Sequence, residues 1–205
     1  MGCSQGDVVF IVADKNKTTL PVLGALRLKV AKQLNIIPDK FNFLWITEFP
    51  FFEWDEENEK WNAMHHPFTM PMDECIQYLD TNPEKVYAKA YDLVLNGVEL
   101  CSGSIRITDF ELQQKMFKSL GLTDEEIEAK FGFLVEAYKY GAPPHGGLGL
   151  GLDRLAMIMC DCDNLRDVTA FPKVQNASEL MSECPSPVDK ASLDILGINL
   201  IENEK

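Results

Sequence analysis

Residues 147–154, Gly-Leu-Gly-Leu-Gly-Leu-Asp-Arg, constrain the fold of this chain more than any other segment. Glycine and leucine alternate with a period of two, which predicts a β-strand with leucines on one face and glycines on the other. Because a glycine face has no Cβ atoms, a flat ligand can lie directly on the backbone. Arg154 follows this strand, so the segment suits a planar, anionic molecule such as a nucleotide.

The spacing of these glycines differs from that of other glycine-rich nucleotide-binding loops. A dinucleotide fingerprint requires G-x-G-x-x-G at the start of a helix, and a P-loop requires G-K-[ST]; the segment has neither. A packed strand whose glycines allow a helix to approach explains the pattern equally well. From this segment alone, the ligand-binding and the packing interpretations both stay open.

The charge and composition of the chain restrict the classes of function. Its 205 residues are 46% hydrophobic, which is typical of one large globular domain or of a domain with an appendage. The formal net charge of −13 argues against a main nucleic-acid anchor, which is normally basic. Since no apolar run is long enough for a membrane span and residues 1–20 lack a signal-peptide pattern, we expect a cytoplasmic protein with no membrane partner. The six cysteines are then expected to be reduced thiols.

The pattern of elements favours an α+β fold, with an antiparallel sheet flanked by helices. We expect strands over residues 7–13, 43–47, 86–95 and 98–107, a loop or hairpin over 53–63, and a break in the last strand near Ser102-Gly103. Asn96-Gly97 predicts a tight hairpin turn between the last two strands. We expect helices over 23–35, 72–79, 109–120 and 123–140, and another from about Arg154. Asp109 is the expected N-terminal cap of the third helix, and Thr123 with Glu126 forms the expected capping box of the fourth. Hairpins followed by helices, without β-α-β alternation, are typical of α+β proteins.

Glu99 and Arg106 are two charged residues on the strand that follows this turn. An arginine can hold a carboxylate through two parallel hydrogen bonds, and a glutamate can hold a magnesium ion that bridges phosphates. The expected break between them leaves open whether they share a face. An ordinary Glu–Arg ion pair on a solvated face is the alternative, and the residues alone favour it.

His65 and His66 form an adjacent pair in front of Pro67. Neighbouring side chains project in different directions, so one could contact a ligand carboxylate or amine while the other packs. A polar turn without a ligand explains the pair equally well. His145, after two prolines, is expected to be a loop residue.

Several segments together resemble the class II aminoacyl-tRNA synthetases, and among them the bacterial-type aspartyl enzymes. Residues 147–154 resemble motif 3 of the class, G-x-G-x-G-x-[DE]-R, and residues 6–15 resemble the end of the GAD insertion domain. More specific similarities lie at residues 43–45, 65–69, 91–100, 103–107 and 170–173. The resemblance implies the end of a GAD-like domain over residues 1–40 and the C-terminal part of a class II catalytic domain over 41–205.

The resemblance also implies roles for individual residues. Arg154 would contact the adenine or the phosphates of ATP, in a pocket lined by Gly151, Leu152 and Asp153. Glu99 would bind ATP through Mg²⁺. Arg106 would hold the side-chain carboxylate of L-aspartate, while His65 would contact the amino acid with His66 beside it. The implied enzyme is an aspartate–tRNA ligase, a homodimer that forms aspartyl-adenylate from ATP and transfers the aspartyl group to tRNA by positioning and charge neutralisation.

The chain departs from the family pattern in three respects. Cys101-Ser102 replaces a glycine-rich stretch, and Thr108 stands where a histidine is usual. No arginine is followed two positions later by glutamate, so the phosphate-gripping Arg-x-Glu of motif 2 is missing, as are motif 1 and the anticodon-binding barrel. We therefore expect the C-terminal part of a longer enzyme that is inactive by itself. The alternative is a non-catalytic module on a synthetase fold that binds an amino acid or ATP, or a partner subunit.

Overall fold

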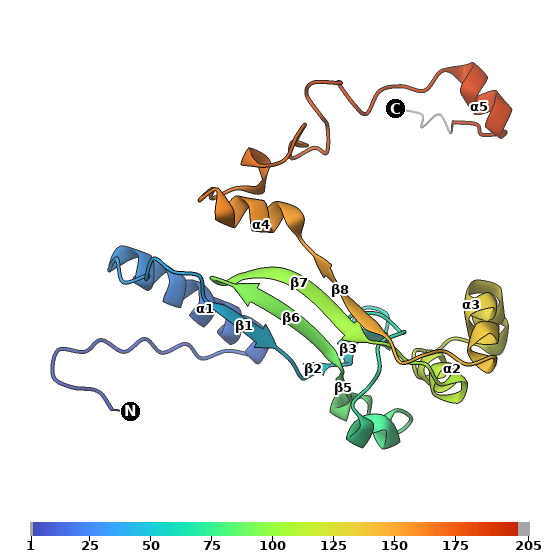
Figure 1. The fold of residues 1–205 in the computed structure, drawn as a ribbon, viewed down its shortest axis with the longest axis horizontal. Coiled ribbons are helices and arrows are strands. Elements are labelled where there is room, and N and C mark those ends of the chain that lie inside the picture. The colour runs from blue at the N-terminus through green and yellow to red at the C-terminus, as the bar shows by residue number, and fades with distance from the viewer. Residues whose placement is uncertain (1, 201–205) are drawn as a thin grey trace. The chain divides into compact units, whose positions relative to one another are not determined.

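The computed structural model describes residues 2–200, so the outermost residues of both predicted domains lie outside it. Within the described chain, two compact units are separated between Asn42 and Phe43. Figure 1 shows the elements of both units.

The first unit contains one helix, α1, over Asn16–Gln33. This helix begins well before the predicted start at Leu23, because it accommodates Pro21 in its second turn at the loss of one backbone hydrogen bond. The strand predicted over residues 7–13 is wrong. A strand requires a paired neighbour, and no described segment pairs with residues 7–13, whose Val8 and Ile11 are exposed.

The second unit is built on a four-stranded antiparallel sheet, which confirms the α+β prediction. Its strands are β1 (Phe43–Ile46), β6 (Ala90–Leu95), β7 (Val98–Ile105) and β8 (Gly146–Leu150), in the order β1-β6-β7-β8. Asn96 and Gly97 both have positive φ, as expected for the turn between β6 and β7. These strands lie side by side in Figure 1. The strand predicted from sequence over 147–152 is therefore confirmed for most of its length.

Two small sheets lie outside this main sheet. β2 (Phe49–Pro50) pairs with β5 (Tyr87–Ala88), and β3 (Phe52–Asp55) pairs with β4 (Lys60–Ala63). The β3–β4 pair confirms the hairpin alternative for residues 53–63. The strand predicted over 86–95 is interrupted at Lys89, since β5 and β6 belong to different sheets.

The irregularity in β7 lies at a different place from the one predicted. Val94 lies opposite Glu99 and Leu93 lies opposite Cys101, so Leu100 is an extra residue without an opposite partner. The strand is continuous through Ser102-Gly103, and the break predicted there is wrong. A β-bulge at Leu100 replaces it, and such a bulge shifts the alternation of side chains by one residue.

Helices and short 3₁₀ turns occupy the connections. The α-helices of the second unit are α2 (Phe110–Ser119), α3 (Asp124–Lys139), α4 (Leu152–Met159) and α5 (Lys190–Leu196); the 3₁₀ turns are η1 (Asp73–Tyr78), η2 (Pro83–Lys85) and η3 (Leu165–Asp167). The predicted helices 109–120 and 123–140 are confirmed, and the prediction over 72–79 corresponds to η1. The last predicted helix starts at Leu152, two positions before Arg154.

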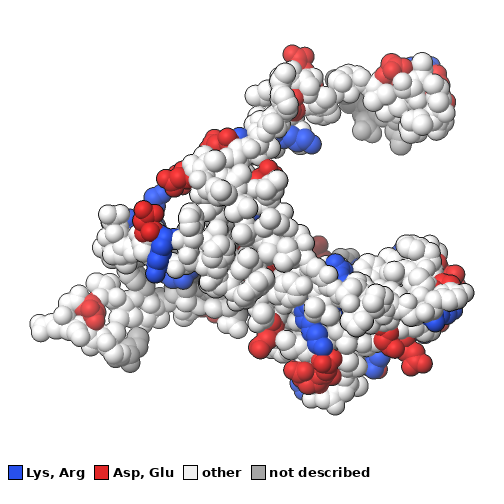
Figure 2. All heavy atoms as spheres, in the orientation of Figure 1, with Lys and Arg blue, Asp and Glu red and all other residues white. Residues whose placement is uncertain are grey.

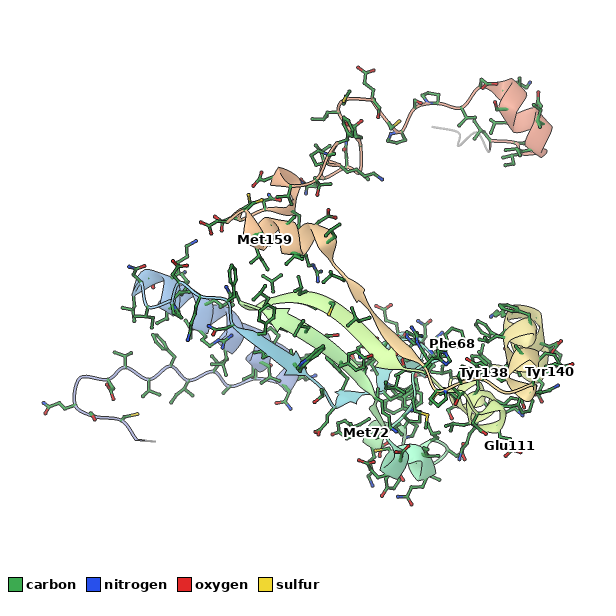
Figure 3. The ribbon with its side chains drawn as sticks, in the orientation of Figure 1. Phe68, Met72, Glu111, Tyr138, Tyr140 and Met159 are labelled. Carbon is green, nitrogen blue, oxygen red and sulfur yellow. The ribbon has the colours of Figure 1, made fainter. Side chains whose placement is uncertain are left out.

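Two apolar clusters hold the second unit together. The larger one joins the small sheets to α2 and includes the buried Phe51, Leu79, Ile107 and Met116. The smaller one joins α2 to α3 through Phe117, Ile127 and Val135, with Phe68 packed against them. Figure 3 places Phe68 between the sheet and α3. Because Phe68 follows the histidine pair, this cluster anchors the segment that carries those histidines.

Thr123 caps the N-terminus of α3, as the sequence predicts. Its side chain accepts from the backbone N–H of Glu126 at 3.2 Å, and the Glu126 carboxylate accepts from the backbone N–H of Thr123 at 2.9 Å. We expect Thr123→Ala to lower the free energy of unfolding by about 1 kcal/mol, measured by urea-induced unfolding. Thr123→Ser keeps the acceptor and is the control. An alanine variant as stable as the serine variant would contradict this role.

Candidate functional site

The register of the sheet places the bare glycines of β8 on the same face as polar residues of β6 and β7. Gly149 lies opposite Ser102, which lies opposite Asp92. Gly147 lies opposite Ser104 in the same way. Directly opposed residues of an antiparallel pair project to the same face. A Cβ built on Gly147 or Gly149 would meet no heavy atom within 4 Å, so this part of the face is open, as the ligand-binding interpretation requires.

The bulge at Leu100 brings Glu99 to this face together with Arg106. Glu99 and Arg106 are seven positions apart, an odd offset, so regular alternation would place them on opposite faces. The extra residue reverses that outcome, and Val94 opposite Glu99 belongs to the same face as Asp92. The structure therefore answers the question that the sequence left open: Glu99, Ser102, Ser104 and Arg106 share one face.

Glu99 forms its ion pair with Arg154, not with Arg106. Nη1 of Arg154 donates to Oε1 of Glu99 at 3.2 Å and to the Glu99 carbonyl oxygen at 2.6 Å. The backbone N–H of Gly151 donates to the Leu100 carbonyl at 2.9 Å, which fixes the start of α4 beside the bulge. The Glu99–Arg106 pair considered as the alternative is not the one that forms. Both charged side chains remain about half exposed and accessible to a ligand.

The other residues predicted to line the ATP pocket lie at the start of α4. Gly151 is the N-cap residue and not part of β8, and a Cβ there would lie 3.2 Å from the Leu100 carbonyl. Leu152 and Asp153 are exposed in the first helical turn. The structure thus brings Gly151 and Arg154 to Glu99, whereas no described contact joins the side chains of Leu152 or Asp153 to it.

Arg106 lies beside the second histidine of the pair. Its Nη1 is 3.1 Å from Nδ1 of His66. The backbone of Arg106 is held on both sides, because its N–H donates to the His145 carbonyl and it forms a β-bridge with Thr69. His65 points elsewhere and packs edge-on against Phe49, with ring centroids 4.9 Å apart. The two histidines therefore project in different directions, as expected.

Two adjacent hollows meet at Arg106. One, of about 380 Å³, is lined by Met64, His65, His66, Ser102, Gly103, Ser104 and Arg106. The other, of about 360 Å³, is lined by Ser102, Gly103, Arg106, His145, Gly146, Gly147, Leu148 and Gly149. The predicted histidines, the predicted arginine and the bare glycine strand thus surround one continuous site with a cation at its centre.

Burial and charge favour the neutral form of His66. Desolvation lowers the pKa of its imidazole below the ordinary 6.5, and the Arg106 guanidinium and His65 act in the same direction. From α3, Tyr138 also faces Arg106. Burial raises the pKa of the Tyr138 hydroxyl, and the positive charge of Arg106 opposes that rise. Figure 3 shows Tyr138 at the end of α3 nearest the sheet.

The lowered pKa of His66 gives the protein an expected pH dependence. As the pH falls, His66 gains its proton in the unfolded chain before it does so in the folded protein. The contribution of His66 to the free energy of unfolding is therefore constant above about pH 6.5 and decreases as the pH drops from there through the folded-state pKa. Urea unfolding of the protein and of His66→Asn, measured between pH 7.5 and pH 5, isolates this contribution. His145→Asn, at an exposed loop position, is the control. Identical pH profiles for the protein and His66→Asn would contradict the expectation.

Asp92 is a site residue that the sequence prediction missed. Its side chain is 9% exposed, and its Oδ1 is buried without a hydrogen-bond partner. A buried carboxylate oxygen is costly unless something pairs with it. The available signal was an acidic residue on the strand face that otherwise carries Ala88 and Ala90. The register places Asp92 on the same face as Glu99.

Asp92 and Glu99 are two carboxylates on one face of the sheet, which is the donor type that a magnesium ion bound with phosphates requires. Mg²⁺ is commonly held by one or two carboxylates plus substrate phosphates and water, not by a complete protein cage. The unpartnered oxygen of Asp92 is the feature that such an ion would satisfy.

The described surface carries charged side chains of both signs. Figure 2 shows acidic side chains in several groups over the face that it presents, with basic side chains scattered between them. None of the helices that the structure describes is both long and apolar enough to cross a membrane.

Comparison with known proteins gives consistent relatives. Residues 23–175 match the family described as tRNA synthetases class II (D, K and N). An aspartate–tRNA ligase of Ruminiclostridium cellulolyticum is 60% identical over 196 residues, which are 95% of this chain and 33% of that protein. An aspartate–tRNA(Asp/Asn) ligase of a Geobacillus species is 54% identical over 201 residues, 98% of this chain and 34% of that protein. The chain thus spans about a third of the length of the curated relatives it matches.

A solved structure extends the comparison to the fold. The aspartyl-tRNA synthetase of Entamoeba histolytica matches 82% of this chain and 29% of its own, with a TM-score of 0.53 and 26% identity. The family match covers well over half of the chain and agrees with this fold and with the motif 3 segment of the site. The chain belongs to the class II tRNA synthetases of the D, K and N group.

Proposed function

We propose that this chain supplies the part of an aspartate–tRNA ligase that binds the side-chain carboxylate of L-aspartate and one end of ATP. The observation that carries the proposal is the position of Arg106 where the two hollows meet, between the histidine pair and the open glycines. An arginine can recognise a carboxylate through two parallel hydrogen bonds, which a neutral amino acid cannot match. The names of the curated relatives support the same assignment.

In this proposal the chain positions substrates and neutralises charge. Arg106 holds the aspartate side chain beside His65, while the adenosine part of ATP lies on the open strand near Gly149 and Arg154. Mg²⁺, held by Glu99 and Asp92, would neutralise the phosphates. The α-carboxylate of aspartate then attacks the α-phosphate of ATP and pyrophosphate leaves, so no side chain has to become a covalent nucleophile.

The proposal extends to a longer enzyme of the kind that the curated relatives represent, of which this chain spans about a third. Its second substrate is tRNA, the acceptor that the relatives' names specify. The resemblance to class II enzymes adds a homodimer and a cytoplasmic location. Relatives named aspartate–tRNA ligase and aspartate–tRNA(Asp/Asn) ligase are both 54% identical to this chain.

Aspartate binding by the chain provides the direct test of the proposal. We expect titration calorimetry to show binding of L-aspartate but not of L-asparagine, and Arg106→Met to weaken aspartate binding about 100-fold, because a charge-assisted contact is lost. Arg166→Met, at an exposed turn, is the matched control and should bind as the unchanged chain does. Equal binding of aspartate and asparagine, or unchanged binding by Arg106→Met, would overturn the assignment.

The polypeptide of these 205 residues is expected not to form aspartyl-adenylate. It contains no Arg-x-Glu to grip the α-phosphate, and electrostatic groups of this kind typically contribute 10²-fold or more to the rate. An ATP–pyrophosphate exchange assay with aspartate should therefore give no signal above that of a reaction without protein. Aspartate-dependent exchange by the purified polypeptide would show that the missing motif is dispensable.

A further inference from the structure

We infer that His66 is a positioning residue, which fixes the Arg106 guanidinium through an unprotonated Nδ1, and that the buried Gln113 anchors the segment carrying it. The inference deepens the proposed function and rests on it for the consequence, since Arg106 is the group proposed to hold the aspartate carboxylate. The geometry of His66 can nevertheless be tested without any ligand.

The hydrogen bonds around His66 determine its tautomer. Nδ1 lies 3.1 Å from Nη1 of Arg106 and 3.2 Å from the backbone nitrogen of Phe68, which donates to it. Both neighbours are obligatory donors, because guanidinium and amide N–H groups have no lone pair to offer. Nδ1 must therefore accept, and the proton of the neutral ring is on Nε2.

The opposite edge of the ring has partners suited to that tautomer. Nε2 lies 3.4 Å from Oγ of Ser104. Oγ1 of Thr69 lies 3.3 Å from Nδ1 and 3.4 Å from Nε2, and it donates to Oγ of Ser104 at 3.3 Å. Thr69 and Ser104 are buried, with exposed fractions of 1% and 2%. A hydroxyl can accept from Nε2–H and donate onward, so His66 is held from both edges.

Protonation of His66 would remove this support. With a proton on Nδ1, the ring could no longer accept from Arg106, and two cations would face each other at 3.1 Å. The charged and titratable groups around the ring are Arg106 at the end of β7, His65 on its own segment and, facing Arg106 from α3, Tyr138. None of these is an acidic group that would stabilise the imidazolium.

Gln113 ties the histidine segment to α2. Its side chain is fully buried, and its Nε2 donates to the Pro67 carbonyl at 2.9 Å. Pro67 lies directly between His66 and Phe68, so this bond fixes the peptide next to the positioning ring. The Oε1 atom of Gln113 has no partner. Because buried polar groups normally form hydrogen bonds, we attribute the burial of the Gln113 side-chain amide to its bond with the Pro67 carbonyl and not to packing alone.

The tautomer is tested on the unliganded protein by long-range ¹H–¹⁵N NMR of the three histidines. We expect His66 to show protonated Nε2 and unprotonated Nδ1 at pH 7. We also expect the Arg106 side-chain N–H signals to shift or broaden in His66→Phe, which lacks an acceptor, and to be restored in His66→Asn. An Nδ1–H tautomer, or Arg106 signals that do not respond, would overturn the inference whether or not the protein binds aspartate.

The consequence for recognition is tested with aspartate calorimetry on the same variants. We expect His66→Phe to weaken aspartate binding about 10- to 100-fold and His66→Asn, which retains an oxygen acceptor, to recover most of it. Gln113→Met should weaken binding, whereas the neighbouring Gln114→Met is the matched control and should not. Far-UV circular dichroism identifies variants that fail to fold. If the unchanged chain does not bind aspartate, the proposed function fails while the NMR result stands; if it binds and His66→Phe binds equally well, the positioning role fails.

Discussion

Phe117→Ala is expected to lower the free energy of unfolding by about 3–5 kcal/mol, the loss typical of a large aromatic residue in a core. Phe117 is fully buried. Its ring stacks on Phe131 with centroids 4.8 Å apart and lies at 90° to Phe68, with centroids 6.0 Å apart. Because a domain is stable by only about 5–15 kcal/mol, this single change should remove a large part of the total. Urea-induced unfolding followed by tryptophan fluorescence measures it.

Phe133→Ala on α3 is the matched control. Phe133 is the same type of residue in the helix that packs on Phe117, but its side chain is 80% exposed. Its removal leaves no cavity, so the change in unfolding free energy should stay within about 0.5 kcal/mol. Comparable losses for both variants would mean that the α2–α3 cluster is not a core. The Phe117 variant should also disturb His66, since Phe68 connects the cluster to the histidine segment.

Gly103→Ala is expected to open the ladder between β7 and β8. A Cβ on Gly103 would lie 2.1 Å from the Gly147 carbonyl oxygen and 2.9 Å from the Leu148 Cα. These are backbone atoms, so neither can move aside as a side chain could. Overpacking costs about 1–3 kcal/mol where neighbours can adjust, and we expect at least the upper end of that range. Urea unfolding measures the loss, and amide hydrogen exchange shows whether β8 has lost its protection.

Gly149→Ala places the same methyl group on the same pair of strands without a clash. Nothing lies within 4 Å of a Cβ there, and alanine is favoured over glycine in a strand by about 0.5–1 kcal/mol. The variant should be as stable as the unchanged protein or slightly more stable. If Gly149→Ala were as damaging as Gly103→Ala, the open face inferred for β8 would be closed in solution.

The fold was predictable wherever the signal is local. The caps at Asp109 and Thr123, the Asn96-Gly97 turn and the alternation of β8 each depend on neighbouring residues, and the structure confirms all of them. The strand predicted over 7–13 failed for the opposite reason. Its apolar run satisfies strand propensity, but pairing depends on a second segment, which periodicity does not reveal.

The sequence predicted several residues of the candidate site but not which of them contact one another. The resemblance named Glu99, Arg106 and Arg154, yet it showed neither that Glu99 pairs with Arg154 nor that a bulge at Leu100 brings Glu99 to the face of Arg106. Asp92 and Gln113 were missed because what distinguishes them is burial. Each is polar, each lies in a segment that reads as an ordinary strand or helix, and only the packed structure shows an oxygen without a partner.

The bulge at Leu100 also limits which insertions and deletions this gene segment can tolerate. Insertion of one codon between Glu99 and Arg106 would leave the strand, the turn and both side chains present, yet would place Glu99 on the opposite face from Arg106 while the bulge still holds a single residue. A change of two codons would preserve the shared face while sliding the strand along its neighbour. Loss of Leu100 alone would instead remove the extra residue and leave an even offset, so Glu99 and Arg106 would stay on one face of a strand without a bulge. Single-codon insertions should therefore be found outside this stretch, where loops absorb them.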